Sequence, residues 1–201
     1  MRGFLVVLGI GLVLLALAAW RDRQTRRVAE TRLGIPVERL HPRASEPDES
    51  QRAALQDFRA AQPRVDARLA DDRFASWDSP ATAEVTNADL LCCPEGMGGL
   101  RELLPSLQRA RADHRCLVVV APAFDEDLLT QLAATTGPAR PLALRADPDA
   151  CHEIARITGA TPADRVDLQS GAAGKLHGKA RRLVCDATAC WLEASTDQPQ
   201  A

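Results

Sequence analysis

The 201-residue chain lacks the features that mark nucleic-acid, zinc-binding and coiled-coil proteins. Aromatic residues make up 3% of it, and a formal charge of −2 with a pI near 6.1 gives no general case for nucleic acid. Its basic cluster, Lys175 to Arg182, has no aromatic side chains on which bases could stack. The four histidines show no Cys/His spacing typical of zinc, and no heptad pattern is sustained. We therefore expect no metal, no cofactor and no nucleic-acid partner.

What is present at the N-terminus is a long apolar run. Residues 3–20 (GFLVVLGIGLVLLALAAW) are uncharged, and as a helix they would span about 27 Å, close to the hydrocarbon thickness of a bilayer. Trp20 suits the membrane interface, and Arg21 and Arg23 end the run. The pattern predicts a single-pass signal anchor. The alternative is a cleaved signal peptide, because Ala16-Leu17-Ala18 has the small-x-small form that precedes a cleavage site.

Two features disagree about the side of the membrane on which the rest of the chain lies. The arginines after the apolar run favour a cytoplasmic body by the positive-inside rule. Six cysteines, an even number, favour an oxidising compartment, and the very short segment before the run suits the topology with the C-terminus outside. We expect a bacterial inner-membrane protein whose soluble domain is periplasmic.

The region before the core is expected to be helical after a basic linker. Ser45-Glu46-Pro47-Asp48 predicts a helix start, and Pro63 is expected to break or kink the helix. An apolar stripe continues along it through Leu55, Phe58, Val65 and Leu69 toward Phe74. Residues 77–86 are expected to form a loop that leads into the first core strand.

The core begins with a β-α-β pattern in residues 88–121. Ala88 to Cys92 is a short apolar run, leucines then recur at helical spacing from Leu100 to Leu107, and Cys116 to Ala121 is continuous enough to be buried on both faces. Further expected elements are a helix at 124–134, a strand at 141–146, a helix opened by Asp147-Pro148 and ended by Gly159, and a hairpin of 182–185 with 190–194. Residues 158–179 are expected to be the least structured. The pattern predicts an α/β fold.

One stretch of this core resembles a known family. Leu90 to Leu107 (LLCCPEGMGGLRELLPSL) resembles the active-site stretch of membrane-anchored thioredoxin-like proteins of the TlpA and MauD kind. In that family a strand leads into Cys-x-x-Cys at a helix start, and a helix-kinking proline follows five positions after the second cysteine. Pro105 matches this proline, so the family's cysteines fall on Met97 and Leu100. The resemblance covers residues 88–194, about half the chain.

The resemblance implies a thioredoxin-like sheet flanked by helices and preceded by a transmembrane helix. Its active-site loop would be degenerate here and consists of Met97, Gly98, Gly99, Leu100 and Pro105. The expected parts are an anchor at 1–20, a juxtamembrane linker at 21–50, a helical segment and loop at 51–87, a thioredoxin-like domain at 88–195 and a flexible tail at 196–201.

The thiols allow a second interpretation. A dithiol oxidoreductase needs an exposed thiolate at a helix N-terminus and a resolving thiol within about one turn, and Met97 to Leu100 supplies neither. Cys92 and Cys93 lie just upstream and are the redox candidates, with Cys116 or Cys151 as a distant partner. Adjacent cysteines form a strained ring, however, and small buried cysteines are common in protein cores.

Cys185 and Cys190 flank Asp186 to Ala189, and we expect them to lie opposite each other in a hairpin. A disulfide is feasible there, and two reduced thiols on neighbouring strands are the alternative. Two glycine-rich stretches are poor phosphate-binding candidates: Gly96 to Gly99 lacks the full dinucleotide spacing, and Gly171 to Lys175 is short for a P-loop, with Leu176 where Ser or Thr would bind magnesium.

Three functions stay open. The leading hypothesis is a membrane-tethered, redox-inactive thioredoxin-like module that binds or helps assemble other envelope proteins through its glycine-rich loop. The alternative is a thiol-disulfide oxidoreductase that uses Cys92 or Cys93. The third is a receiver-like doubly wound interaction domain, although Cys93 stands where a receiver has its phosphorylated Asp.

Overall fold

The computed structural model describes residues 46–78, 81–135, 140–171 and 175–195. The predicted anchor at 3–20, most of the linker and the tail from residue 196 lie outside these ranges. Within them, no helix is both long enough and apolar enough to cross a bilayer. The helices are α2 (Glu49–Ala61), α3 (Leu100–Ala112), α4 (Glu126–Ala133), α5 (Pro148–Thr158) and α6 (Arg165–Ser170), with a 3-10 turn η2 (Asp72–Phe74).

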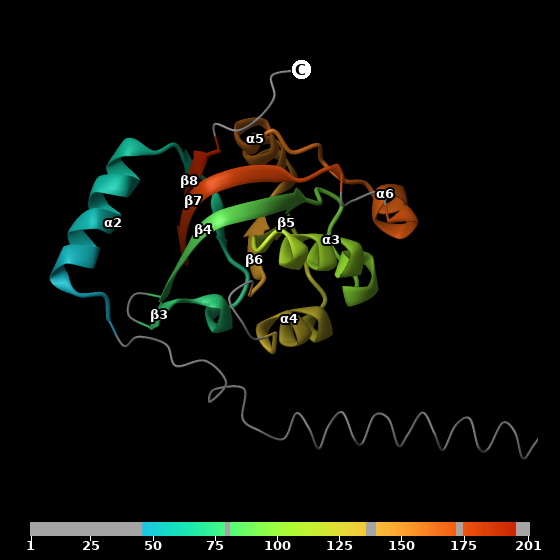
Figure 1. Cartoon of the computed structure of the whole chain (residues 1–201), viewed down its shortest axis with the longest axis horizontal. Helices are drawn as coiled ribbons and strands as arrows, with labels where there is room; N and C mark the ends of the chain where they lie inside the picture. The colour runs from blue at the N-terminus through green and yellow to red at the C-terminus, as the bar shows by residue number, and fades with distance from the viewer. Residues whose placement is uncertain (1–45, 79–80, 136–139, 172–174, 196–201) are drawn as a thin grey trace, which may run out of the picture. The chain divides into compact units, whose positions relative to one another are not determined.

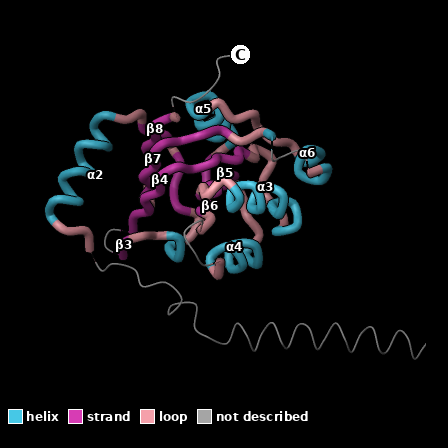
Figure 2. Tube along the Cα trace, in the orientation of Figure 1, coloured by secondary structure: helices cyan, strands magenta, loops and turns pink. Residues whose placement is uncertain are grey.

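One mixed sheet forms the core (Figures 1 and 2). Its strands are β1 (Arg64–Val65), β2 (Ala67–Leu69), β3 (Trp77–Asp78), β4 (Ala81–Cys92), β5 (Cys116–Ala121), β6 (Leu142–Ala146), β7 (Gly178–Asp186) and β8 (Cys190–Ala194). The strand order is β1-β8-β7-β4-β5-β6-β2, and β3 pairs with β4. Strands β4, β5 and β6 are parallel, whereas β7 is antiparallel to β4 and β8 is antiparallel to β7. The predicted α/β class is confirmed.

The central β-α-β prediction is also confirmed. β4 ends at Cys92, α3 begins at Leu100, and β5 has the predicted bounds of Cys116 and Ala121. Every residue of β5 is buried, as expected for a strand covered on both faces. α3 and α4 lie side by side in Figure 1, and α5 packs against β4 and β7.

The predicted helical stripe between residues 61 and 74 is wrong. α2 ends at Ala61, and Val65 and Leu69 belong to β1 and β2, where buried and exposed residues alternate as in a strand. The segment from 77 to 86 is not a loop, because it forms β3 and the first half of β4, which pairs with β7 from Thr82 to Thr86. The β4–β7 pairing joins distant parts of the chain, so the local spacing of residues could not predict it.

β1 and β2 give the sheet its curl. They lie at opposite ends of the strand order, yet only Asp66 separates them in the sequence. The sheet therefore curls until this one segment pairs with β8 on one side and with β6 on the other. The Cys185 Sγ of β7 lies 3.7 Å from the carbonyl oxygen of Ala67, which places β2 beside the β7–β8 hairpin.

The later elements follow the prediction with two exceptions. α4, β6, α5 and the hairpin are confirmed, and α5 ends at Gly159 in the left-handed conformation. The expected unstructured stretch instead contains α6 and the start of β7. α6 is one short helix that starts with a capping box from Asp164 and buries only Leu168, so its apolar pattern is too brief to detect.

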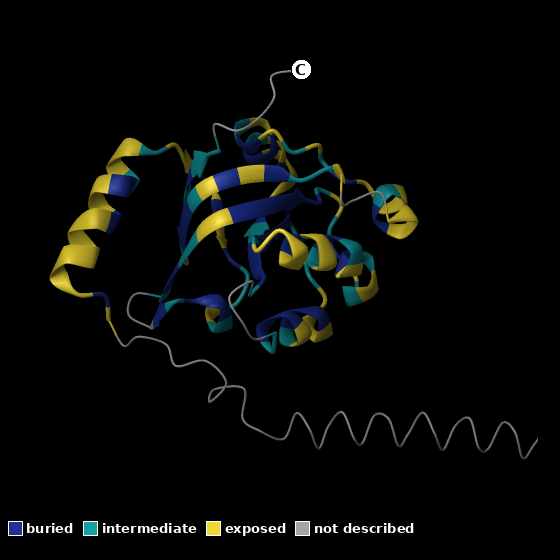
Figure 3. Cartoon of the chain, viewed as in Figure 1, coloured by how far each residue is buried: buried dark blue, intermediate teal, exposed yellow. Residues whose placement is uncertain are grey.

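α2 is held by a small separate cluster on the β7–β8 side of the sheet. Leu55 and Phe58 pack with Trp77 and Val184, and Trp191 is half-buried against them. The Arg59 guanidinium lies 4.6 Å from the centre of the Trp191 ring. The rest of α2 is exposed, as Figure 3 shows.

Candidate functional site

The strongest candidate site is the loop between β4 and α3, where the sequence placed the degenerate active-site loop. Gly96 turns the chain with a φ of 95°, a conformation that favours glycine. Met97 is buried and forms an isolated parallel bridge with Phe124, with its N–H donating to the Ala123 carbonyl at 3.0 Å. Met97 therefore fixes the loop against the segment that follows β5, so the loop presents a defined surface.

Gly98 and Gly99 form the bare part of this surface. Neither has a positive φ, and a Cβ built on either meets no other atom within 4 Å. Gly99 is the N-cap residue of α3 and makes no side-chain cap. Neither backbone conformation nor packing thus demands glycine at these two positions, and their lack of side chains leaves room above the backbone.

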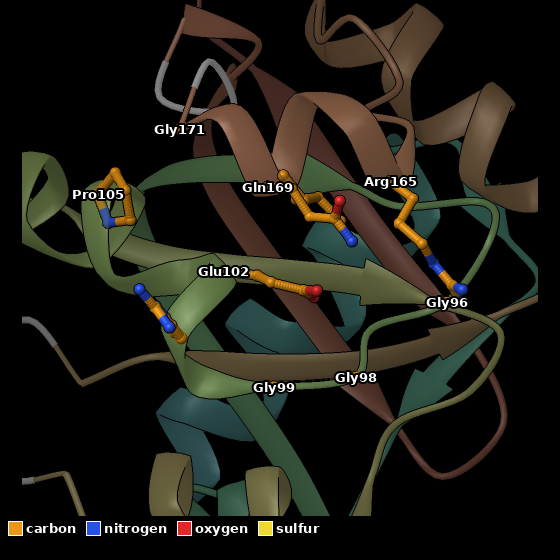
Figure 4. Close-up of a pocket in the computed structure, with 10 residues that line it drawn as sticks. Gly96, Gly98, Gly99, Glu102, Pro105, Arg165, Gln169 and Gly171 are labelled. Atoms are coloured by element: carbon orange, nitrogen blue, oxygen red, sulfur yellow. The ribbon is translucent and has the colours of Figure 1, made fainter.

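That room is a hollow of about 680 Å³ between the start of α3 and α6. Its lining consists of Gly96, Gly98, Gly99, Arg101, Glu102, Pro105, Arg165, Leu168, Gln169 and Gly171. Figure 4 shows Glu102, Arg165 and Gln169 reaching toward the same space. The volume is within the range of ligand-binding clefts, and the lining carries two arginines against one glutamate. The predicted loop residues Gly98, Gly99 and Pro105 belong to this hollow, whereas Met97 lies in the core.

The redox candidates do not reach this surface. Cys92 and Cys93 are completely buried, and so is Cys151. Burial, with the neighbouring Cys151 thiol as the next cause, raises the pKa of Cys93 to about 12 and that of Cys92 further. Burial likewise raises the pKa of Cys116 and of Cys151 to about 12. Reactive cysteines have lowered pKa values and partial exposure, so these four thiols have the character of core residues.

A buried polar cluster beneath α3 escaped the sequence analysis. The Arg115 Nε donates to Asp89 Oδ1 at 2.5 Å, and the His177 Nδ1 lies 3.8 Å from Asp89 Oδ2. The His177 Nε2 is 3.0 Å from the Ser106 hydroxyl. Burial raises the pKa of Asp89, but the His177 ring and the Arg115 guanidinium outweigh burial and hold that pKa below its ordinary value. The one sequence signal was an aspartate inside the apolar run that begins at Ala88.

The cluster contains a serine, a histidine and an aspartate, the residue types of a hydrolase triad. Ser106 has no exposed surface and belongs to the core side of α3, so its hydroxyl cannot meet a substrate in this structure. The distance of 3.8 Å between His177 and Asp89 also exceeds hydrogen-bond length. The cluster therefore links α3 to β4 and to the residue before β7 as a structural contact.

The hairpin cysteines lie where the sequence placed them. Cys185 pairs directly with Cys190 across β7 and β8, and both are free thiols here. The next pair along the hairpin is hydrogen-bonded, because the Asp186 N–H donates to the Ala189 carbonyl at 2.9 Å. Hydrogen-bonded pairs alternate with non-hydrogen-bonded ones, so Cys185 and Cys190 occupy a non-hydrogen-bonded position, where side chains approach most closely. The disulfide stays a prediction.

The basic residues between Lys175 and Arg182 do not form one patch. His177 is buried in the polar cluster, and Arg182 pairs with Glu84 at 2.8 Å. Arg181 is exposed and 3.3 Å from Glu193. In the described ranges, no group of three or more His, Cys, Asp and Glu side chains could hold a metal ion.

Comparisons with known proteins identify no family. No family model and no curated protein matches the chain. The similar solved structures include two crystal forms of the chaperonin gp146 from bacteriophage EL 2 (Pseudomonas aeruginosa). Form I is 14% identical with a TM-score of 0.48 and 80% of this chain covered; form II is 15% identical with a TM-score of 0.46 and 68% covered. The chain spans 40% and 29% of those chains, and a likeness this low carries no argument.

Proposed function

We propose that this protein is a membrane-tethered, redox-inactive thioredoxin-like module that binds an envelope protein through the glycine-rich surface at the start of α3. The observation that carries the proposal is the bare backbone of Gly98 and Gly99 above a hollow of about 680 Å³. A protein segment laid against this backbone can approach more closely than any side chain would allow.

The order of the elements supports the thioredoxin-like part of the proposal. A β-α-β unit (β4, α3, β5) is followed by the antiparallel β7–β8 hairpin in the same sheet, which is the order that the resemblance implied. Pro105 lies inside α3, as the resemblance also implied. The antiparallel β7 beside β4 counts against a receiver-like domain, because doubly wound receiver folds have parallel strands.

The buried thiols support the redox-inactive part. Attack on a disulfide requires a thiolate with access to the substrate, and Cys92 and Cys93 have neither exposure nor a lowered pKa. The full-length chain, purified in a neutral detergent, should reduce insulin no faster than a buffer blank. Reduction at the rate of an active thioredoxin would contradict this, and loss of that rate in Cys93→Ser would locate the reacting thiol.

The docking surface can be tested by changing side-chain size at one position. Gly98→Ser adds a small group and Gly98→Trp fills the hollow, and neither should lower the free energy of unfolding by more than about 0.5 kcal/mol, because the position is open. Co-purification of one envelope protein with the chain should survive the serine variant and fail in the tryptophan variant. Equal recovery of the envelope protein with both variants would show that it binds another surface of the chain.

The tether is proposed from residues 3–20 alone. Membrane fractionation of bacteria that express the full chain should recover it as an integral protein that retains its N-terminus. A soluble mature chain that starts near Ala19 would show cleavage instead. Labelling of the exposed Lys175 and Lys179 by an amine reagent that cannot cross the inner membrane would separate the periplasmic from the cytoplasmic topology.

A further inference from the structure

A second hollow is lined by two arginines whose guanidinium groups make no structural contact that the described residues account for. It lies where β2 and β6 meet the β7–β8 turn, and its volume is about 480 Å³. Its lining consists of Asp66, Arg68, Pro122, Arg145, Ala146, Asp147, Ala187 and Thr188. Arg68 and Arg145 are Cα partners in the antiparallel β2–β6 ladder. Both side chains therefore leave the same face of the sheet from neighbouring positions.

This arrangement is unfavourable in the absence of a ligand. Like charges directly opposite each other destabilise an antiparallel pair. Among the residues that the structure describes, no hydrogen bond or ion pair engages either guanidinium, and the Nε of Arg145 is buried without a partner. A buried donor without an acceptor costs free energy that a bound acceptor would recover.

Two carboxylates line the same hollow, and their negative charges could offset those of the arginines. The Asp147 carboxylate accepts the Ala150 N–H at 2.7 Å as the N-cap of α5, so the positive end of that helix offsets its charge. Asp66 is exposed to solvent, which screens it. Neither forms an ion pair with Arg68 or Arg145 in the described part. The arginine pair is thus the part of the hollow with unused hydrogen-bonding capacity.

We infer that Arg68 and Arg145 together bind a phosphate group. Guanidinium groups bind phosphate through paired N–H donors, and a tetrahedral phosphate has enough acceptor oxygens to face two guanidinium planes at once. A bound phosphate would remove the repulsion between the arginines and provide an acceptor for the Arg145 Nε. The hollow is larger than a free phosphate ion needs, so it also admits the organic part of a phosphate monoester.

Calorimetric titration of the full-length chain with inorganic phosphate and with glycerol 3-phosphate tests the site, at constant ionic strength set with chloride. Arg68→Gln and Arg145→Gln should each weaken binding by about tenfold or more, since a hydrogen bond to a charged group is worth at least that factor. Arg101→Gln, in the hollow beside α3, is the matched control and should leave the affinity unchanged. If glycerol 3-phosphate binds more tightly than inorganic phosphate, the site is one for a phosphate monoester. If the two bind equally, the site is one for free phosphate.

Thermal unfolding without phosphate gives an independent readout. Arg68→Gln should melt at the same temperature as the wild type or higher, because it removes a like-charge pair, and phosphate should raise the melting temperature of the wild type only. Because Arg68 is exposed, this variant should fold even if Arg145→Gln does not. The inference would be overturned if the wild type did not bind phosphate at millimolar concentration. It would also be overturned if Arg68→Gln kept the wild-type affinity, or if Arg101→Gln abolished binding.

Discussion

Alkaline pH should destabilise this protein through its buried thiols. Burial raises the pKa of Cys93, Cys116 and Cys151 to about 12 and raises the pKa of Cys92 and of Cys185 well above the ordinary value, whereas an unfolded cysteine titrates near pH 8.5. Between these values the unfolded chain loses protons that the folded chain keeps. The folded state then binds more protons, so the free energy of unfolding falls as the pH rises through 8.5.

The size of the effect follows from linkage. One pH unit above the unfolded pKa, each such thiol lowers the free energy of unfolding by between about 1 and 2 kcal/mol. Five thiols together should remove on the order of 5 to 10 kcal/mol by pH 9.5, which is comparable with the whole stability of an ordinary domain. The chain has no tyrosine, so no phenol adds to this titration.

The assay is denaturant unfolding under reductant at pH 7.5, 8.5 and 9.5. Stability should be flat below pH 8 and fall steeply above it. Cys151→Ala starts from a lower stability, yet its loss between pH 8.5 and 9.5 should be smaller by about one fifth, since one of five equivalent thiols is gone. A free energy of unfolding that is unchanged up to pH 9.5 would refute the reasoning, as would rapid alkylation of any of the five thiols in the folded protein.

Three further predictions follow from single contacts. Gly178→Ala should lower the free energy of unfolding by about 1 to 3 kcal/mol, because the alanine Cβ would lie 2.8 Å from the Thr158 Cβ. Urea titration measures this, and a stability equal to wild type would show that α5 shifts without cost. Arg115→Gln should cost about 3 to 5 kcal/mol, because it leaves the buried Asp89 carboxylate without its guanidinium, and a cost below about 1 kcal/mol would contradict the pairing. Mass spectrometry of non-reduced peptides from exported protein should show the Cys185–Cys190 disulfide; free thiols at both positions would exclude it and weaken the periplasmic assignment.

The parts of the fold that the sequence predicted are those with local signals. β5 was predicted with its exact bounds because six consecutive apolar residues fill it, and α5 because Asp147-Pro148 opens it and Gly159 closes it. β1, β2 and the first half of β4 depend on partners more than 50 residues away, so local periodicity could not reveal them. The small and polar residues of the first half of β4 matched a loop, whereas Val65 of β1 and Leu69 of β2 matched an apolar helical stripe.

The candidate site was predicted in part for the same reason. The glycines of the loop are visible in the sequence, and their position at a helix start follows from the leucine spacing of α3. The α6 wall of the hollow comes from a short helix with one buried residue, and the Asp89–His177 contact joins residues 88 positions apart. Only the folded sheet brings these groups together.

Photo-crosslinking in living bacteria tests the central claim most directly. A crosslinking amino acid at Arg101, on the rim of the hollow, is compared with one at Arg111, which is exposed near the other end of α3. The account predicts one defined envelope-protein adduct from position 101, none from position 111, and loss of the adduct when Gly98→Trp is added while Gly98→Ser keeps it. The same adduct from both positions, or an adduct that persists with tryptophan in the hollow, would contradict the claim that this surface binds a partner.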